Sequence, residues 1–356
     1  MKRIKTYLTL VIIFLLFNSC DDSKLFSLES DSSGVIFENK LEYTEEFNPY
    51  TYRNFYNGGG VALGDINNDG LIDIYLTGNI VENKMFLNKG NFQFEDITKV
   101  SGLACPNVWS TGATFADING DGLLDLYVCK SGAPEGENRH NELFINNGDL
   151  TFSEESKKYN LDILGLSVHA AFFDYDKDGD LDCYILNNSI RSIGGYDLIE
   201  DQREIADPEG QGNKLLENRD GKFVDVTQSA GIYSSKIGFG LGITLSDYNN
   251  DGWTDLFISN DFFEKDYLYV NNKDGTFSEE SENFFQSLSL GSMGADSSDL
   301  DNDLLTDLIV TEMLPKSLKR KKTKAIYESW DKYSLANSKG YYHQFPRNVL
   351  QRNYGP

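Results

Sequence analysis

Acidic runs of nine residues occur five times along the chain, at 65–73, 117–125, 174–182, 247–255 and 299–307. The first copy, DINNDGLID, places carboxylate or amide oxygens at positions 1, 3, 5 and 9 and a glycine at position 6. Hard oxygen donors of this kind, with a backbone carbonyl expected from position 7, suit Ca²⁺. Glycine lets the backbone turn tightly with positive φ around the ion. The predicted ligands are Asp65, Asn67, Asp69, Leu71, Asp73, Asp117, Asn119, Asp121, Leu123, Asp125, Asp174, Asp176, Asp178, Asp180, Asp182, Asp247, Asn249, Asp251, Trp253, Asp255, Asp299, Asp301, Asp303, Leu305 and Asp307.

The main alternative for these runs is the EF-hand, whose loop needs a bidentate Glu at position 12 and a helix on either side. Runs such as Ile74–Thr77, which follow the acidic loops, are β-branched and aromatic, so they favour strands. The loops are therefore expected to join strands, and dockerin-like calcium loops are disfavoured on the same ground. Position 12 is aliphatic in every copy: Leu76, Val128, Ile185, Ile258 and Val310.

The loops recur with a period of roughly 50 to 70 residues, which is typical of a propeller or solenoid. A second motif shares this period, as in the run NKMFLNKGNFQFEDIT from Asn83. It reads as two short strands around an Asn/Gly turn, the chemistry of a tight hairpin. Each unit is then a four-stranded antiparallel meander: a Gly/Ala-rich strand, the acidic loop, an apolar strand and the hairpin. Four such strands make one blade of a β-propeller.

These residues resemble the FG-GAP/VCBS repeat family, whose members form calcium-loop propellers like the integrin α-subunit head. The resemblance runs from about residue 37 to the end. It is greatest to long Bacteroidetes envelope proteins, which often end in an ASPIC/UnbV domain. It implies an all-β β-propeller over 34–356, with a calcium-binding loop between strands one and two of each blade. Five blades are recognisable, and we interpret the fifth as truncated after a run at 347–355 that resembles a third strand and its turn. Closure of the ring then needs further blades or a partner chain.

The fifth loop departs from the pattern because Leu304 replaces the turn glycine. A left-handed backbone at a leucine costs on the order of 1 kcal/mol. We therefore expect the fifth loop to be the weakest calcium site, although all four of its acidic ligand residues are present.

The N-terminus has the features of a secretory signal at residues 1–19: three basic residues and then an apolar run too short to span a bilayer. Cys20 follows a small residue and resembles the lipidated cysteine of a bacterial lipobox. Residues 20–33 are then a lipidated polar tether, and the resemblance places the protein in the outer membrane or at the cell surface through a lipid anchor. A plain signal peptide with a coincidental cysteine is the alternative.

The formal net charge of −24 argues against nucleic acid as a partner, because phosphate binding needs cationic side chains. Much of this charge belongs to the acidic loops, whose carboxylates repel one another until a cation neutralises them, so stability is expected to depend on Ca²⁺. Cys105, Cys129 and Cys183 have no short spacing and do not form a disulfide framework. For Cys129 and Cys183, which lie in apolar strands, we expect buried free thiols.

No catalytic motif is recognisable, because the three histidines lack ligand or nucleophile spacing. The telling feature is extra length after the second strand of three blades, at Ser131–Asn141, Ser189–Gly212 and Pro315–Pro346. In a meander these connections emerge on the face opposite the acidic loops, and elaborated loops on a rigid scaffold are where recognition usually lies. Residues expected to meet on that face are Arg191, Tyr196, Lys319, Arg320, Tyr327 and Trp330.

The sequence therefore predicts a calcium-stabilised cell-envelope lipoprotein that acts as a binding or scaffold module for an extracellular glycan or protein ligand, rather than an enzyme. A carbohydrate-active enzyme resembling propeller polysaccharide lyases is the alternative. A structural fragment without a ligand of its own is a third reading.

Overall fold

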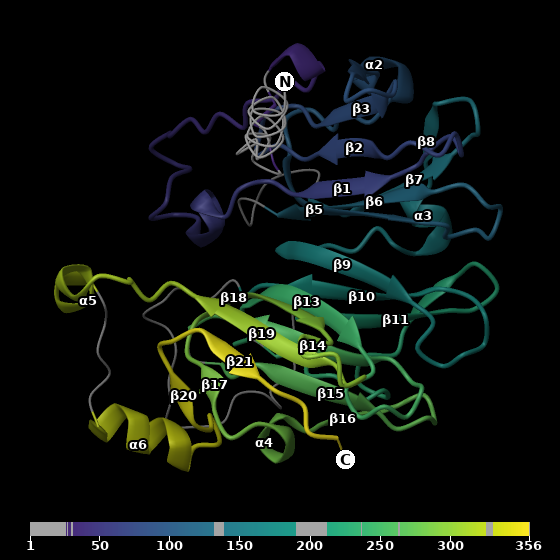
Figure 1. Ribbon diagram of the computed structural model, residues 1–356. Coiled ribbons are helices and arrows are strands. Elements are labelled where there is room, and N and C mark those ends of the chain that lie inside the picture. The colour runs from purple at the N-terminus through teal and green to yellow at the C-terminus, as the bar shows by residue number, and fades with distance from the viewer. Residues whose placement is uncertain are drawn as a thin grey trace, which may run out of the picture.

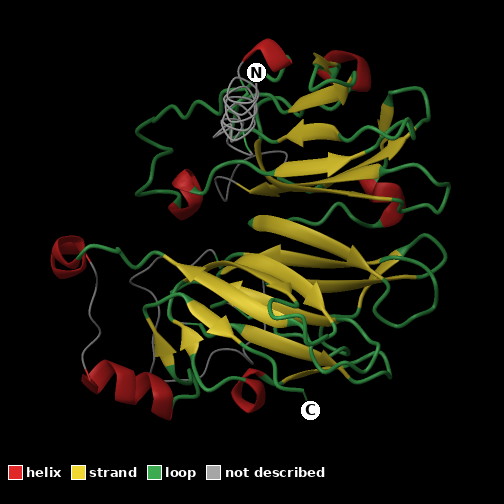
Figure 2. Ribbon diagram, in the orientation of Figure 1, coloured by secondary structure: helices red, strands yellow, loops and turns green. Residues whose placement is uncertain are grey.

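The protein is all-β apart from short helices (Figures 1 and 2). The computed structural model describes residues 26, 28–29, 31–131, 139–189, 212–235, 237–262, 264–324 and 330–355. The predicted signal peptide, Cys20 and most of the predicted tether lie outside these residues.

Four antiparallel sheets of four strands each follow one another along the chain. They are β1 (Val61–Gly64), β2 (Asp73–Leu76), β3 (Lys84–Asn88) and β4 (Phe94–Asp96); β5 (Trp109–Ala116), β6 (Asp125–Ser131), β7 (Glu142–Asn146) and β8 (Phe152–Glu154); β9 (Ser167–Phe173), β10 (Asp182–Asn187), β11 (Lys214–Asn218) and β12 (Phe223–Asp225); and β13 (Gly240–Ser246), β14 (Asp255–Asn260), β15 (Tyr267–Asn271) and β16 (Phe277–Glu279).

Each sheet is a simple meander in sequence order, as the repeat predicts. The second strands β6, β10 and β14 are buried at every residue, which matches their continuous apolar sequences. Cys129 and Cys183 are buried free thiols, as expected, and burial raises their pKa. These sheets have the form of propeller blades, and we number them one to four.

The first strands of successive blades lie side by side along the middle of the molecule, and β5 contacts both β1 and β9. Small residues allow this approach: a Cβ at Gly112 would lie 2.5 Å from the carbonyl oxygen of Val168. Thr114 Oγ1 donates to the carbonyl of Ala170 at 2.7 Å, from one blade to the next. In the part of the chain that is described, no strand pairing returns from blade five to blade one, and Val61 and Leu63 of β1 are exposed.

Blade five has three strands, β18 (Ser292–Ser298), β19 (Asp307–Glu312) and β21 (Val349–Gln351). Between β19 and β21 the chain forms α5 (Leu318–Lys324), α6 (Trp330–Ser338) and β20 (Gln344–Phe345). Strand β20 pairs in parallel with β17 (Leu288–Ser289), a pairing that the repeat pattern does not predict. Short helices also follow the fourth strands: α2 (Thr98–Ser101), α3 (Ser156–Tyr159) and α4 (Ser281–Phe284).

An aromatic cluster joins the N-terminal segment to blade two. Phe47, Tyr52 and Phe55 surround Trp109, with ring centroids 5.1 to 5.4 Å from its ring. Two 3-10 helices, Asp31–Ser33 and Arg53–Tyr56, lie in this segment. Among the described residues, no helix has the length and apolar character that crossing a membrane requires.

Candidate calcium-binding loops and the opposite face

All five acidic loops connect the first strand of a blade to the second, so they lie at one end of the blades (Figure 1). Their backbone is left-handed at position 6 in every copy: φ is 83° at Gly70, 87° at Gly122, 100° at Gly179, 88° at Gly252 and 71° at Leu304. The strain expected at Leu304 is therefore present. Position 4 is left-handed as well, with φ between 56° at Asn68 and 73° at Gly120. The Asn or Gly at this position in four of the five copies carries that signal in the sequence.

The aspartates at positions 1 and 5 of a loop accept hydrogen bonds from backbone N–H groups of the same loop. In the first loop, Asp65 Oδ1 accepts from the N–H of Asp69 at 3.1 Å and Oδ2 accepts from Gly70 at 2.7 Å. Asp69 Oδ1 in turn accepts from Leu71 at 2.9 Å. The second, fourth and fifth loops repeat all three bonds. The third loop makes the two bonds from Gly179 and Asp180, and its Asp174 Oδ1 has no partner among the described residues.

The aspartate at position 9 of each loop joins the loop to the rest of the blade. Asp125 is fully buried; its Oδ2 accepts from the N–H of Ile118 at 3.0 Å, and its Oδ1 accepts from the N–H of Asn146 at 2.9 Å. Asn146 ends the third strand, so one carboxylate holds the loop, the second strand and the hairpin together. Asp73, Asp182, Asp255 and Asp307 make the same pair of bonds.

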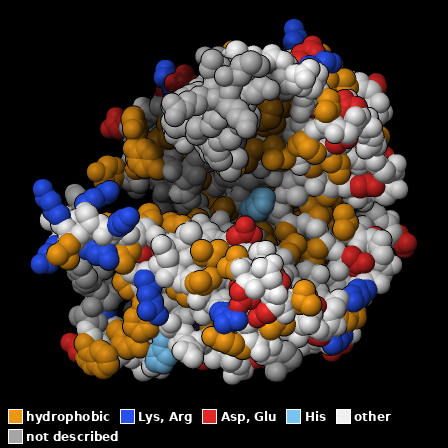
Figure 3. All heavy atoms as spheres, viewed as in Figure 1, with side chains coloured by type: hydrophobic (Ala, Val, Ile, Leu, Met, Phe, Trp, Pro, Cys, Tyr) orange, Lys and Arg blue, Asp and Glu red, His pale blue; other side chains and the backbone are white. Residues whose placement is uncertain are grey.

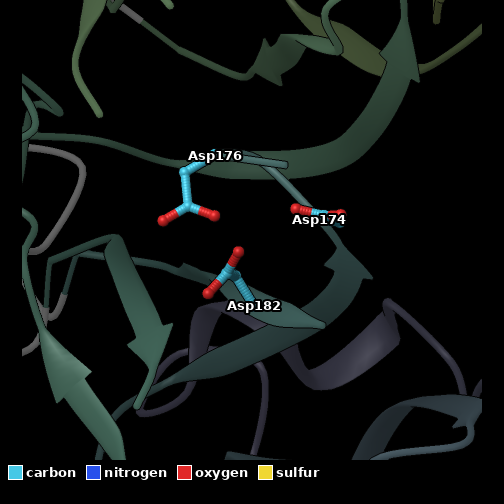
Figure 4. A group of neighbouring side chains, drawn as sticks. All are labelled: Asp174, Asp176 and Asp182. Carbon is cyan, nitrogen blue, oxygen red and sulfur yellow. The ribbon is translucent and has the colours of Figure 1, made fainter. Parts of the chain in front are cut away.

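Three carboxylates converge in the third loop, where Asp174, Asp176 and Asp182 present oxygens that lie within 4.8 Å of one another. Figure 4 shows Asp176 and Asp182 facing each other with Asp174 beside them. The fifth loop brings Asp299, Asp301 and Asp307 together in the same way. These are positions 1, 3 and 9. The carboxylate at position 5 belongs to neither group, and the side chain of Asp178 instead accepts from the N–H of Asp180 at 3.1 Å.

The third loop contains buried oxygens that a cation would satisfy. Asp174 Oδ1 and Asp180 Oδ1 are buried without a hydrogen-bond partner among the described residues. Burial, and after it neighbouring carboxylates, raise the pKa of Asp180 to about 6 and that of Asp182 to about 7. Carboxylate oxygens that are partly buried and repel one another are better satisfied by coordination to Ca²⁺ than by hydrogen bonds to water. The predicted ligand residues at positions 1, 3 and 9 therefore form a suitable donor set.

The loops differ in which side chains contact their exposed carboxylates. In the first loop position 3 is an amide, and Asn67 Nδ2 donates to Asp69 Oδ2 at 3.0 Å. In the fourth loop Lys273 lies 3.1 Å from Asp251. In the fifth loop Arg352 pairs with Asp301 and lies 3.6 Å from Asp303. A cation in the fifth loop must compete with this guanidinium, a second reason to expect weak binding there.

A hollow of about 200 Å³ lies at the other end of the blades, where the first strands begin. We call it the axial hollow. Its walls include Asn54, Asn57, Trp109, Thr111 and His169. Asn54 is only 4% exposed, and His169 is half-buried. Burial lowers the pKa of His169, so the neutral ring offers one donor and one acceptor. Figure 3 shows this side of the molecule hollowed between its upper and lower halves.

The blade-five insertion lies away from this hollow. In Figure 1, α5 and α6 lie at the flank of blade five, at the end opposite the acidic loops. Tyr333 of α6 stacks on His343 and Phe345, while Trp330 is 75% exposed. Lys319, Arg320 and Trp330 therefore lie at the end opposite the acidic loops, and they do not line the axial hollow. Arg191, Tyr196 and Tyr327 lie outside the described residues.

Sequence reasoning missed Asn54 and Trp109. Residues 43–56 are rich in aromatic side chains, with Tyr43, Phe47, Tyr52 and Phe55. This composition was the signal in the sequence that the segment packs against the blades.

Comparisons with known proteins support the repeat. A family model described as FG-GAP-like repeat matches residues 65–128 and 247–310, so the chain contains two such repeats. Cartilage acidic protein 1 from Xenopus tropicalis is 28% identical over 233 residues, which cover 64% of this chain and 32% of that protein. The Homo sapiens protein of the same name is 28% identical over 207 residues, covering 57% and 28%. The chain spans about a third of the length of these relatives.

Among solved structures, a Bifidobacterium bifidum protein that carries the assignment exo-beta-1,3-galactanase is similar with a TM-score of 0.36 and 13% identity. The alignment covers 71% of this chain and 81% of the other.

Proposed function

We propose that this protein is a calcium-stabilised envelope lipoprotein that binds an extracellular glycan or protein ligand at the end of the blades opposite the acidic loops. The observation that carries the proposal is the axial hollow, whose walls bring together the side chains of Asn54, Thr111 and His169. Amide, hydroxyl and imidazole groups that line a hollow can hydrogen-bond to the hydroxyl or amide groups of a ligand.

The acidic loops are assigned a structural role in this proposal. Their aspartates are already engaged with loop backbone and with the hairpin, and Ca²⁺ bound there would stabilise a rigid end. When bound, the ion supplies charge neutralisation to the converging carboxylates. Ligand recognition is then left to the other end.

The carbohydrate-active enzyme is the second candidate, and the axial hollow argues against it. Glycoside cleavage ordinarily uses two carboxyl groups that flank the bond. Among the residues that line the hollow, the sole ionisable side chain is His169. A neutral, hydroxyl- and amide-lined hollow suits binding of an uncharged sugar unit or a peptide group.

A glycan-array and peptide-array screen in Ca²⁺ tests the binding role. A ligand that binds wild-type protein should lose about tenfold or more in affinity on Asn54→Ala or His169→Ala, because each change removes a group that would hydrogen-bond to the ligand. Asn272→Ala is the matched control, since this exposed asparagine lies at the loop end. Ligands that the Asn272 variant loses and the Asn54 variant retains would contradict the proposal.

The envelope anchor is tested separately by fractionation. Wild-type protein should pellet with membranes, and Cys20→Ser should release it or leave it unprocessed. A soluble wild-type protein with an unmodified amino terminus downstream of Cys20 would show that there is no lipid anchor.

A further inference from the structure

A strongly basic segment lies between β19 and β21 of blade five. Residues 313–324 contain six Lys or Arg residues and no Asp or Glu. The whole chain, in contrast, has 32 Lys and Arg residues against 56 Asp and Glu. Positive charge is therefore concentrated locally in a protein that is acidic as a whole.

Most of this basic segment is the helix α5, whose cations face solvent. Ser317 precedes the helix, and its Oγ accepts from the N–H of Arg320 at 3.3 Å, as an N-cap does. Lys319, Arg320 and Lys322 are exposed, and none of them makes an ion pair with a carboxylate of the described residues. Lys319 and Lys322 are three residues apart on one helix, so their like charges repel. An anionic surface would relieve this repulsion.

Large apolar side chains accompany the cations. Met313, Leu318 and Trp330, the first residue of α6, are each at least 65% exposed. The Trp330 ring lies against Tyr333, with centroids 5.4 Å apart, and Tyr333 stacks on Phe345 at 5.7 Å. The exposed indole is therefore held by a packed aromatic cluster. Figure 3 shows Lys and Arg side chains gathered at one edge of the molecule with hydrophobic side chains beside them.

The combination of cations with exposed apolar side chains favours an anionic bilayer over a soluble polyanion. A polyanion is bound through its charges and has no need of exposed residues such as Met313 and Leu318. A bilayer uses both kinds of side chain, because its headgroups attract Lys and Arg while apolar side chains enter the boundary with the acyl chains.

The acidic loops do not oppose such a contact, because they lie at the other end of the blades (Figure 1). A second strand such as β6, with seven residues, spans roughly 20 Å between the two ends. This length exceeds the Debye length of about 8 Å at physiological salt, beyond which exposed charges are largely screened.

We propose that the basic segment 313–324 and Trp330 form a docking surface for an anionic lipid bilayer. Lys319, Arg320 and Lys322 contact the lipid headgroups, and Leu318 and Trp330 enter the boundary with the acyl chains. Docking would hold the axial hollow near the bilayer, because both lie at the same end of the blades. The contact needs neither Cys20 nor the residues of the axial hollow, so its failure and the failure of the proposed function are distinguishable.

Vesicle sedimentation tests this surface with the chain of residues 21–356, which includes all described residues but neither the predicted signal nor Cys20. The protein should pellet with vesicles of phosphatidylcholine mixed with phosphatidylglycerol and not with vesicles of phosphatidylcholine alone. Added NaCl should weaken the binding. Tryptophan fluorescence should shift to the blue on binding, and Trp330→Phe should lose this shift, because Trp109 is buried and Trp253 lies in an acidic loop.

Two double variants locate the surface. Lys319→Gln/Lys322→Gln should weaken binding to the anionic vesicles about tenfold or more, because each cation adds to the attraction. Lys99→Gln/Lys157→Gln is the matched control, since it also neutralises exposed lysines of short helices, α2 and α3, and it should bind as wild type does. Absence of pelleting, equal pelleting with both vesicle types, or no effect of Lys319→Gln/Lys322→Gln would overturn the proposal. Displacement of the vesicles by a soluble acidic polysaccharide, together with unchanged binding by Trp330→Ala, would also overturn it, since the partner would then be a polyanion.

Discussion

The two ends of the blades differ in how closely their structure repeats from one blade to the next. At the loop end, five copies keep the same left-handed turns and the same pair of hydrogen bonds to the aspartate at position 9. At the opposite end, one blade carries two helices and another carries the aromatic N-terminal segment over Trp109. Repetition is what a shared structural requirement produces, while variation is what recognition of a particular ligand requires. The comparison fits the proposal, in which the loop end stabilises the fold and the other end binds the ligand.

The largest expected effect is at the ninth position of a loop. Asp125→Ala leaves the N–H groups of Ile118 and Asn146 without their acceptor in a buried site. The free energy of unfolding should fall by roughly 3 to 5 kcal/mol. Because these bonds do not involve an ion, the loss should persist in EGTA, as denaturant unfolding in EGTA can measure.

Asp121→Ala is the matched control in the same loop. Asp121 is exposed and lies at position 5, so its effect should be smaller and should be seen in Ca²⁺ but not in EGTA. If Asp121→Ala lost as much stability in EGTA as in Ca²⁺, position 5 of this loop would not be a calcium ligand.

At the opposite end, Asp266 distinguishes blade four from blades one to three, which have Asn83, Asn141 and Asn213 at this place. Asp266 accepts from the N–H of Asn260 at 2.8 Å and from Ser292 Oγ at 2.7 Å, and burial raises its pKa to about 7. The folded state therefore binds this proton more tightly than the unfolded state does. Stability should fall as pH rises from about 4 to about 7, by on the order of 2 to 4 kcal/mol.

Asp266→Asn should reduce the pH dependence of stability and stabilise the protein at neutral pH. The new amide can donate to Ser292 as Asn141 Nδ2 donates to Ser167 Oγ at 3.0 Å. Thermal unfolding of both proteins at pH 5 and pH 8 measures the effect. The reverse change, Asn141→Asp, should introduce the same dependence in blade two. A variant that is less stable than wild type at pH 8 would contradict the assignment.

The smallest expected effect is within the loop end itself. Leu304 has φ 71° and is 86% exposed, so its side chain contributes little packing to offset the strained backbone. Leu304→Gly should stabilise the protein by about 0.5 to 1 kcal/mol. Chemical denaturation measures this gain, and Leu300→Gly, at a half-exposed residue of the same loop, should not reproduce it. Destabilisation by Leu304→Gly would mean that the fifth loop is not strained.

The regular end could be predicted from sequence and the irregular end could not. The spacing of the loops and aliphatic residues such as Leu76 and Val128 predicted strands on both sides of each loop. The glycine at position 6 predicted the left-handed turn. The role of the ninth aspartate as a hub was not foreseen, because its partner, such as Asn146, is brought close only by the hairpin. The axial hollow depends on Asn54 and His169, which are far apart in sequence and meet only through blade packing.

The central claim, that the loop end is a set of structural calcium sites, is tested most directly by melting the full chain in EGTA and in EGTA saturated with Ca²⁺. Ligand that binds only the folded state raises its stability with free concentration, so the melting temperature should rise by several degrees with Ca²⁺. The rise should shrink in Asp69→Ala and Asp121→Ala, whose loops lose a carboxylate. Melting curves that coincide in the two buffers would contradict the account.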